Sequence, residues 1–311
     1  MSKITRKLVL SLLTVVLTVV ALGTTTFAWF TLTNTSTVQP FEAEIVGDTG
    51  IEIALGEHAG VASAPTDYDW KTTLTTADVE NYIASAYGGT FQFGHVTTED
   101  GVNFFTLGAS SLTSTGTGYL EIPLNFRSNS ADQINWTAIT MSSATYNWTI
   151  DVDFTGVSGA LTTPGTVGVD ASNGMRIAMI SQALYGGFTV GYEKAAGGSP
   201  ANVVLDGDGS EQDLSNGGIG DAGAMSYYYA KNNALPFTAD AVTVLDTIQT
   251  LGTGQPVISM DDVSGSPTNY EADFFGQVMV RIWLEGWDAN TYNSILSQIV
   301  STTFAFEGVT A

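Results

Sequence analysis

The chain has 311 residues, no cysteine, and 9 Lys and Arg against 31 Asp and Glu, which gives a formal net charge of −22. A surface this acidic repels phosphate backbones and anionic membrane surfaces, so nucleic-acid binding is excluded as a function class. Hydrophobic residues make up 44% of the chain and charged residues 13%, which favours a folded, β-rich exported protein over a disordered acidic tail.

The first thirty residues have the pattern of an export signal. Three basic residues precede an apolar run from Leu8 to Gly23, and small residues lead up to Ala28. We expect residues 1–28 to be a secretory signal peptide that is cleaved near Ala28. The alternative is a retained membrane anchor, because residues 8–30 are long enough to span a bilayer with the basic end in the cytoplasm. Both alternatives place the rest of the chain outside the cytoplasm.

Beyond the export segment, short stretches of alternating apolar and polar residues are separated by Gly, Ser, Asn and Pro. Alternation with a period of two predicts strands, here over residues 41–46, 51–55, 119–126, 148–154, 175–179, 278–284 and 302–306. Many short strands in one chain predict an all-β fold, an antiparallel β-sandwich of jelly-roll type. We expect one domain over residues 46–311, with a loop-rich insertion at about 186–275.

Helices are expected to be few and short. Thr75 or Thr76 is placed to cap a helix over residues 77–86, whose apolar side chains fall on one side. Helical spacing of apolar residues also occurs over 239–251 and over 289–300.

A search for catalytic motifs favours a protein that is not an enzyme. His58 and His95 have no metal-ligand spacing, and the single Asp-Thr-Gly at residues 48–50 lacks the second copy that an aspartic protease needs. We interpret Asp-Thr-Gly as a turn between two strands. Glu285 and Asp288, which flank Trp287, are expected to end a strand rather than to form a glycosidase pair.

One acidic loop has the composition of a calcium site. Carboxylate and hydroxyl oxygens alternate with glycines in this loop, a pattern that can wrap Ca²⁺, and the candidate ligands are Asp206, Asp208, Ser210 and Asp213. Gly217 stands where an EF-hand has its Glu, and the alternative is a solvated acidic turn. No other cofactor is expected. Three Asn-x-Ser/Thr triplets, which begin at Asn34, Asn135 and Asn147, are interpreted as chance matches in a threonine-rich chain.

Four segments resemble the TasA/camelysin family of exported matrix fibre proteins. They are the end of the export segment (Thr26-Phe27-Ala28-Trp29-Phe30), the strand pair over 41–55, the strand that begins Gly174-Met175-Arg176, and the segment 280–288, VRIWLEGWD. The resemblance covers about a third of the chain, mostly its two ends, and does not extend to residues 186–275. Camelysin was named as a metalloprotease, but this sequence has no zinc motif, so that activity is not carried over.

The resemblance implies a jelly-roll subunit that polymerises when an N-terminal strand of one copy completes a sheet of the next. The candidate donor strand lies within residues 29–45, and its expected interface residues are Trp29, Phe30, Leu32, Thr33, Thr35, Thr37 and Val38. This stretch is uncharged and β-prone up to Pro40, which suits β-augmentation. The alternative is that it pairs within its own subunit as an edge strand.

Together these patterns predict a structural subunit of a secreted or cell-surface filament or matrix fibre, bacterial or archaeal. Its partner would be further copies of itself, without nucleic acid, and with a membrane only through residues 8–30 if they stay uncleaved. Two alternatives remain: a membrane-anchored adhesion or ligand-binding module, and a viral structural protein with a jelly-roll fold. A carbohydrate-binding protein would use exposed aromatic side chains such as Trp70, Tyr227, Tyr228 and Tyr229.

Overall fold

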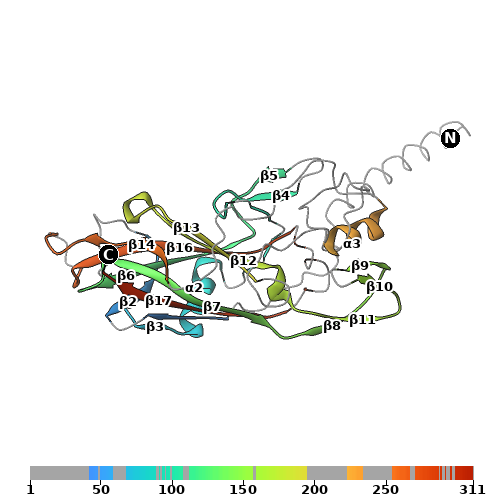
Figure 1. Cartoon of the computed structure of the whole chain (residues 1–311), viewed down its shortest axis with the longest axis horizontal. Helices are drawn as coiled ribbons and strands as arrows, with labels where there is room; N and C mark the ends of the chain where they lie inside the picture. The colour runs from blue at the N-terminus through green and yellow to red at the C-terminus, as the bar shows by residue number, and fades with distance from the viewer. Residues whose placement is uncertain are drawn as a thin grey trace, which may run out of the picture.

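The computed structural model describes residues 42–47, 50–58, 68–88, 91, 93–94, 96–98, 100–107, 112–156, 159–194, 223–233, 254–266, 270–286, 288, 291, 295 and 298–310. The described chain is all-β, with two sheets that face one another and two short helices (Figure 1). The expected β-sandwich is therefore confirmed.

The first sheet, sheet A, has five strands. Its order is β14 (Gln255–Ser259), β7 (Gln133–Ser143), β17 (Val300–Val309), β1 (Glu42–Gly47) and β3 (Thr73–Leu74). β7 and β17 are its long central pair, antiparallel over ten residue pairs with a bulge between Ala305 and Phe306. β1 runs parallel to β17, in contrast to the antiparallel pairing of every other pair of named strands in the described chain. The expected antiparallel arrangement thus has this one exception.

The second sheet, sheet B, has the order β13 (Thr189–Glu193), β12 (Met175–Ser181), β16 (Phe274–Leu284), β6 (Leu120–Ser128) and β2 (Ile51–Leu55). The short strand β15 (Asp261–Asp262) pairs with the beginning of β16. Alternate side chains of both sheets point into the space between them, where Ile53, Phe126, Ile177, Val280 and Phe304 are fully buried in one large apolar cluster. The period of two in the sequence is what places these residues on one face.

The outer face of sheet B, turned away from sheet A, is covered in part by a third layer. This layer includes the hairpin of β4 (Phe105–Leu107) and β5 (Leu112–Ser114). Phe104 stacks on Tyr119 with ring centroids 3.9 Å apart and meets Trp283 of β16 edge-on at 5.2 Å. These rings bury the outer side of β16 near its end.

A smaller lobe extends from the end of sheet A (Figure 1). It contains a ribbon of β8 (Tyr146–Thr149) and β11 (Thr166–Val169), a hairpin of β9 (Phe154–Gly156) and β10 (Gly159–Leu161), and helix α3 (Gly223–Asn232). Ile150, Phe154 and Tyr227 form its own buried apolar cluster. Short 3₁₀ turns, η1 (Ala171–Gly174) and η2 (Ala183–Tyr185), flank β12.

Helix α2 (Thr76–Ala86) confirms the helix expected over 77–86 and its cap. Thr75 Oγ1 accepts a hydrogen bond from the backbone N–H of Asp78, and the Asp78 carboxylate accepts one from the backbone N–H of Thr75 at 2.8 Å. This reciprocal capping box satisfies backbone donors that a helix start otherwise leaves free. Val79 carries the buried side of α2 into the main core.

Six of the seven expected strands are confirmed as β1, β2, β6, β12, β16 and β17. The expected strand over 148–154 is wrong as a single strand, because β8 ends at Thr149 and β9 begins at Phe154. Between them the Asp153 carboxylate accepts hydrogen bonds from the backbone and the hydroxyl of Thr163, so this stretch pairs with a turn rather than with a strand. The alternating burial persists: Ile150 and Phe154 are buried, whereas Thr149 and Asp153 are exposed.

The region expected to be a loop-rich insertion contains regular elements. β13, α3, β14 and β15 all fall between residues 186 and 275, so this region supplies one edge strand of each sheet. The possible helix over 239–251 lies outside the described residues, as does most of 289–300, and β17 begins at Val300.

Candidate functional site

Both sets of site residues singled out in the sequence lie outside the described part of the chain. These are the expected interface residues from Trp29 to Val38 and the candidate calcium ligands Asp206, Asp208, Ser210 and Asp213. Within the described residues, no group of three or more His, Asp or Glu side chains has the geometry to hold a metal ion. The described chain does contain the strand that follows the candidate donor segment and the sheet edges that a donor could join.

The strand after the candidate donor segment, β1, is held by its own chain. Its register against β17 runs from Glu42 opposite Ser301 to Gly47 opposite Phe306, and its far side pairs with β3. Ile45 is fully buried and joins the main core with Leu74 of β3. Residues 42–45, which belong to the expected donor region, are therefore part of a strand that extends to Gly47.

A short connection joins β1 of sheet A to β2 of sheet B. Three residues separate the two strands, and Gly50, the last of them, has a φ of +100°, which glycine adopts without steric cost. The backbone N–H of Gly47 donates to the carbonyl of Thr72 at 2.9 Å. Gly50 of the Asp-Thr-Gly triplet lies in a turn directly before β2, and the other two residues of the triplet lie outside the described part of the chain. Because the link is so short, β1 cannot leave its sheet without moving β2.

Three of the four strands at the sheet edges carry features that block further pairing. β14 contains Pro256 and a register shift between Pro256 and Ile258, and β3 is two residues long. β2 is covered by Lys71, which exchanges two backbone hydrogen bonds with Ile53. Proline, bulges, short length and covering segments are the usual means of protecting a sheet edge.

β13 has no proline, no bulge and a length of five residues. Its sequence is TVGYE, and it pairs with β12 in unbroken register. Its one charged residue, Glu193, is buried and forms an ion pair with Arg176. In the described part of the chain β13 has β12 on one side and no strand on the other.

The direction of the backbone groups of β13 follows from the turn that precedes it. The backbone N–H of Ser181 donates to the carbonyl of Phe188 at 2.9 Å, which makes this a hydrogen-bonded pair of the antiparallel ladder. Such pairs alternate along the strand, so Val190 and Tyr192 direct their backbone groups toward β12. Thr189, Gly191 and Glu193 direct theirs away from β12. Of these three, Thr189 is half-buried, whereas Gly191 and Glu193 are buried.

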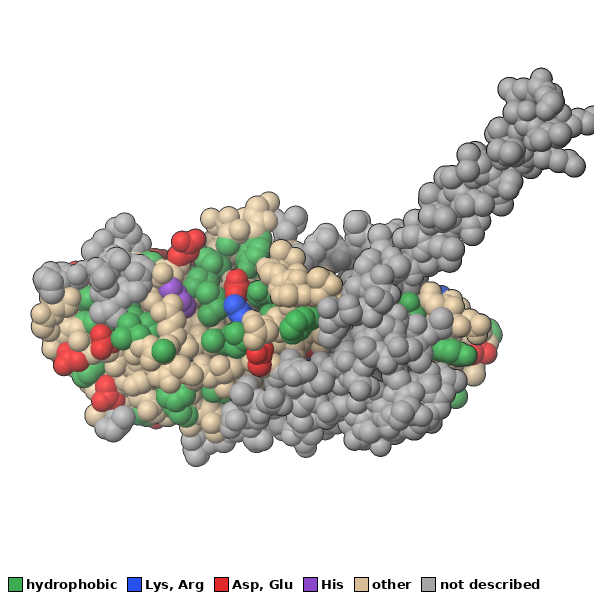
Figure 2. All heavy atoms as spheres, turned by 90° about the horizontal axis from the view of Figure 1, so that it is seen from above, with side chains coloured by type: hydrophobic (Ala, Val, Ile, Leu, Met, Phe, Trp, Pro, Cys, Tyr) green, Lys and Arg blue, Asp and Glu red, His purple; other side chains and the backbone are tan. Residues whose placement is uncertain are grey.

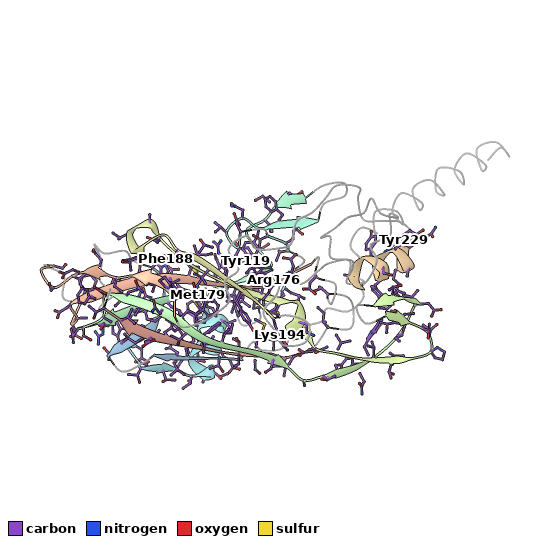
Figure 3. All side chains as sticks on the ribbon, viewed as in Figure 1. Tyr119, Arg176, Met179, Phe188, Lys194 and Tyr229 are labelled. Carbon is purple, nitrogen blue, oxygen red and sulfur yellow. The ribbon has the colours of Figure 1, made fainter. Side chains whose placement is uncertain are left out.

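A buried ionic cluster anchors the end of β13. The Arg176 guanidinium contacts three carboxylates: Nε lies 2.7 Å from Glu193, Nη1 3.5 Å from Glu285 and Nη2 3.4 Å from Asp288. All four side chains have at most 1% of their surface exposed. Figure 3 places Arg176 near the middle of the molecule, where β12 passes the end of β16. The cluster joins β12, β13 and the chain after β16 on the outer face of sheet B.

The indole nitrogen of Trp283 and a backbone hydrogen bond hold Glu285 in the cluster. Trp283 Nε1 donates to Glu285 at 3.1 Å, and the backbone N–H of Glu285 donates to the carbonyl of Gly174 at 2.9 Å. Glu285 and Asp288 do follow the end of a strand, as expected. Their partner Arg176 was missed in the sequence, although a charged residue inside the apolar run Met175-Arg-Ile-Ala-Met was a signal of a buried ion pair.

A second polar cluster lies directly after β13. Lys194 Nζ lies 2.7 Å from an Asp170 carboxylate oxygen and 2.7 Å from the Ser172 hydroxyl, which itself donates to Asp170 at 2.6 Å. Burial alone would raise the pKa of Asp170, but hydrogen bonds from Lys194, Ser143 and Ser172 outweigh it and hold the pKa below its usual value. The cluster binds Lys194, which directly follows β13, to η1, so two polar clusters fix the C-terminal end of β13.

The aromatic residues considered for sugar binding are mostly internal. Tyr227 is fully buried and Tyr228 is 8% exposed, and the Tyr227 hydroxyl donates to Asp151 at 3.1 Å. Trp70 is half-buried beneath the Arg127 guanidinium, which lies 4.7 Å from its ring centroid. Figure 3 shows Tyr229 on α3, away from Met179 in the main sandwich. These side chains do not form one exposed platform.

His58 is packed against sheet B. Its Nε2 lies 3.3 Å from the carbonyl oxygen of Leu124, and burial lowers its pKa from the ordinary value. His95 lies outside the described residues.

Among the described residues, no helix combines the length and the apolar composition needed to cross a bilayer. Comparisons of the chain with protein-family models, with curated proteins and with solved structures found no match.

Proposed function

We propose that this protein is a non-enzymatic structural subunit of an extracellular filament, assembled when residues 29–39 of one copy pair with the edge of β13 that faces away from β12 in the next. The observation that carries the proposal is that β13, alone among the four edge strands of the described sandwich, has no proline, no bulge and no exposed charge, is five residues long, and pairs with a described strand on one side only. An edge of this kind is a template for a further strand.

The position of the donor segment supports the same assembly. Residues 29–39 directly precede β1, which is fixed to its own chain by β17, β3 and the short link to β2. Only Pro40 and Phe41 separate the donor segment from β1, so the fixed position of β1 limits how far from its own subunit the donor can reach. This narrows the donor from residues 29–45 to residues 29–39, because residues 42–45 already have partners.

The chemistry of β-augmentation suits an acidic subunit. Main-chain hydrogen bonds supply most of the affinity, and they do not depend on side-chain charge. Residues 29–39 contain no charged side chain, so their insertion next to another acidic copy adds no like-charge contact of its own.

Electron microscopy of variants tests the proposal. Deletion of residues 29–39, with the rest of the mature chain intact, should abolish filaments while the circular dichroism spectrum and cooperative unfolding persist. A synthetic peptide of sequence WFTLTNTSTVQ should cap growing filaments of the full chain, whereas a scrambled peptide should not. Filaments of the deletion variant would contradict the proposal.

A substitution in β13 tests the acceptor edge. Thr189→Pro removes a backbone N–H that points away from β12, so it should block assembly without breaking the ladder to β12. Thr189→Val keeps the N–H and is the matched control. Equal assembly of the two variants would exclude β13 as the acceptor.

A further inference from the structure

The same three residues, Asn-Trp-Thr, occur twice in the chain, at 135–137 and at 147–149. Asn-x-Thr is the acceptor triplet for N-linked glycosylation, in which the threonine hydroxyl at the third position is part of the recognition. Two identical triplets in different surroundings allow the accessibility of the asparagine to be compared directly. The third triplet, at Asn34, lies outside the described residues.

The first triplet is enclosed by sheet A. Asn135 lies in β7 between two neighbours, opposite Pro256 of β14 and Glu307 of β17. Its Oδ1 accepts a hydrogen bond from Gln133 Nε2 at 2.7 Å, and a Cβ placed on Gly254 would lie 2.8 Å from its Nδ2. The amide nitrogen that would carry a glycan therefore abuts the backbone of the neighbouring segment.

The threonine of the first triplet is also occupied. The Thr137 hydroxyl donates to the carbonyl of Ala305 in β17 at 3.1 Å. A glycosylating enzyme would need to displace both this bond and the contact at Gly254 before it could engage the triplet.

The second triplet lies on the open side of the β8–β11 ribbon. Asn147 is opposite Gly168, so no side chain stands beside it on the partner strand. Asn147, Thr149, Thr166 and Gly168 share one face of the ribbon and all four are exposed. Trp148 and Val167 take the other face, where they pack against the lobe's buried cluster.

The extended backbone presents the asparagine and the threonine together. Residues i and i+2 of a strand point to the same side, so the Asn147 amide and the Thr149 hydroxyl face outward side by side. The tryptophan between them is turned inward and keeps the ribbon attached, with its ring 5.9 Å from that of Tyr227.

We propose that Asn147 carries an N-linked glycan and that Asn135 does not, which replaces the interpretation of the Asn147 triplet as a chance match. In this transfer a bond forms between Asn147 Nδ2 and the anomeric carbon of an oligosaccharide. The bond from that carbon to the phosphate of a polyprenyl-phosphate-linked sugar donor breaks, and the proton lost from the amide goes to the leaving phosphate. No oxidant or reductant is needed. The modification requires the location outside the cytoplasm on which the proposed function also rests.

The sequence provides a clean way to separate the two triplets. Cyanogen bromide cleaves after Met141 and Met175, so the fragment 142–175 contains Asn147 and neither of the other triplets. In protein purified from its own host, mass spectrometry of this fragment should show an excess of at least one monosaccharide. An unmodified 142–175 fragment in that material would overturn the proposal.

Variants expressed in the same host assign the modification. Thr149→Ala should remove the mass excess from the 142–175 fragment and Thr149→Ser should retain it, because serine supplies the same hydroxyl. Asn135→Gln should leave the excess unchanged. A mass excess that persists in Thr149→Ala, or that is found on Asn135, would contradict the assignment. Filament formation is scored separately, so an unmodified protein that still polymerises would overturn this inference and leave the proposed function standing.

Discussion

At the scale of single residues, the six basic side chains beyond residue 28 account for much of the described polar structure. Each contacts at least one carboxylate: Lys71, Arg127, Arg176, Lys194, Lys231 and Arg281 all lie within 3.5 Å of an Asp or Glu oxygen. Their energetic weight differs with burial. A pair at the surface contributes at most about 1 kcal/mol, whereas removal of one partner from a buried pair costs several times more.

Arg176 is therefore the basic residue whose loss should be most damaging. In Arg176→Met, three buried carboxylates would lose their only described cationic partner, and we expect the free energy of unfolding to fall by about 3–5 kcal/mol. Lys231→Met is the control, because its pair with Asp151 is partly exposed and should cost below about 1 kcal/mol. Urea unfolding curves measure both. Similar midpoints for the two variants would show that the buried cluster adds nothing to stability.

Asp170 should make stability depend on pH in the acid range. Its pKa in the folded protein is lower than the usual 3.8, so the charged form is favoured by folding. That stabilisation is fully present above the pKa of the unfolded chain and is lost as the pH falls through the lower folded value. The difference in unfolding free energy between the wild type and Asp170→Asn should thus be largest near neutral pH and shrink below pH 3.8. Urea unfolding of the wild type and Asp170→Asn, near neutral pH and below pH 3.8, measures this difference. The same difference in unfolding free energy under both conditions would contradict the role given to Asp170.

At the scale of elements, the N-terminal cap of α2 can be tested by substitution of a single residue. Thr75→Ala removes the side-chain oxygen that accepts from the Asp78 N–H, and we expect a loss of about 1 kcal/mol. Thr75→Ser keeps a capping hydroxyl and should stay close to the wild type. Thermal unfolding measures the stability of the two variants. Equal losses of stability in both would mean that the hydroxyl does not contribute to the cap.

The elements also show how far the sequence predicts this fold. Strands with one buried and one more exposed face, such as β2 and β17, have the alternation that a period of two predicts. β13, with the sequence TVGYE, and β7, whose later residues are small and polar, have weak alternation because neighbouring segments decide their burial. The parallel pairing of β1 with β17 joins segments over 250 residues apart, which no local pattern encodes.

The candidate site was predictable only in part, for related reasons. The uncharged donor segment is a property of composition, so the sequence alone indicates it. The proposed acceptor edge is a property of topology: β13 is the last strand of sheet B, and this follows only from the order of strands in that sheet. The cluster around Arg176 likewise combines residues from 176 to 288 that have no common sequence motif.

At the scale of the whole molecule, charge opposes association. The chain beyond residue 28 has six bases against 31 acids, and the six bases are all engaged in ion pairs within the chain. Figure 2 shows acidic side chains spread over the described part of one face, with a basic side chain beside an acidic one. Copies of this chain repel one another unless screened.

Salt should therefore promote assembly. As ionic strength rises from 0.01 M to 0.15 M the screening length falls from about 30 Å to about 8 Å, which weakens repulsion between subunits but leaves backbone hydrogen bonds intact. We expect filaments to form sooner and in higher yield, as followed by light scattering and electron microscopy. Filaments that dissolve over this range of salt would mean that attraction between opposite charges holds them.

The absence of cysteine allows the central claim to be tested by crosslinking between copies. Variants that combine Thr189→Cys in β13 with cysteine at position 33, 35 or 37 should give a ladder of disulfide-linked polymers on a denaturing gel, lost on reduction, for at least one donor position. The control combines the same donor positions with Thr166→Cys, which is exposed on the β8–β11 ribbon. Strand complementation at β13 predicts a ladder with Thr189→Cys and not with Thr166→Cys. Monomers throughout, or equal ladders in both sets, would contradict it.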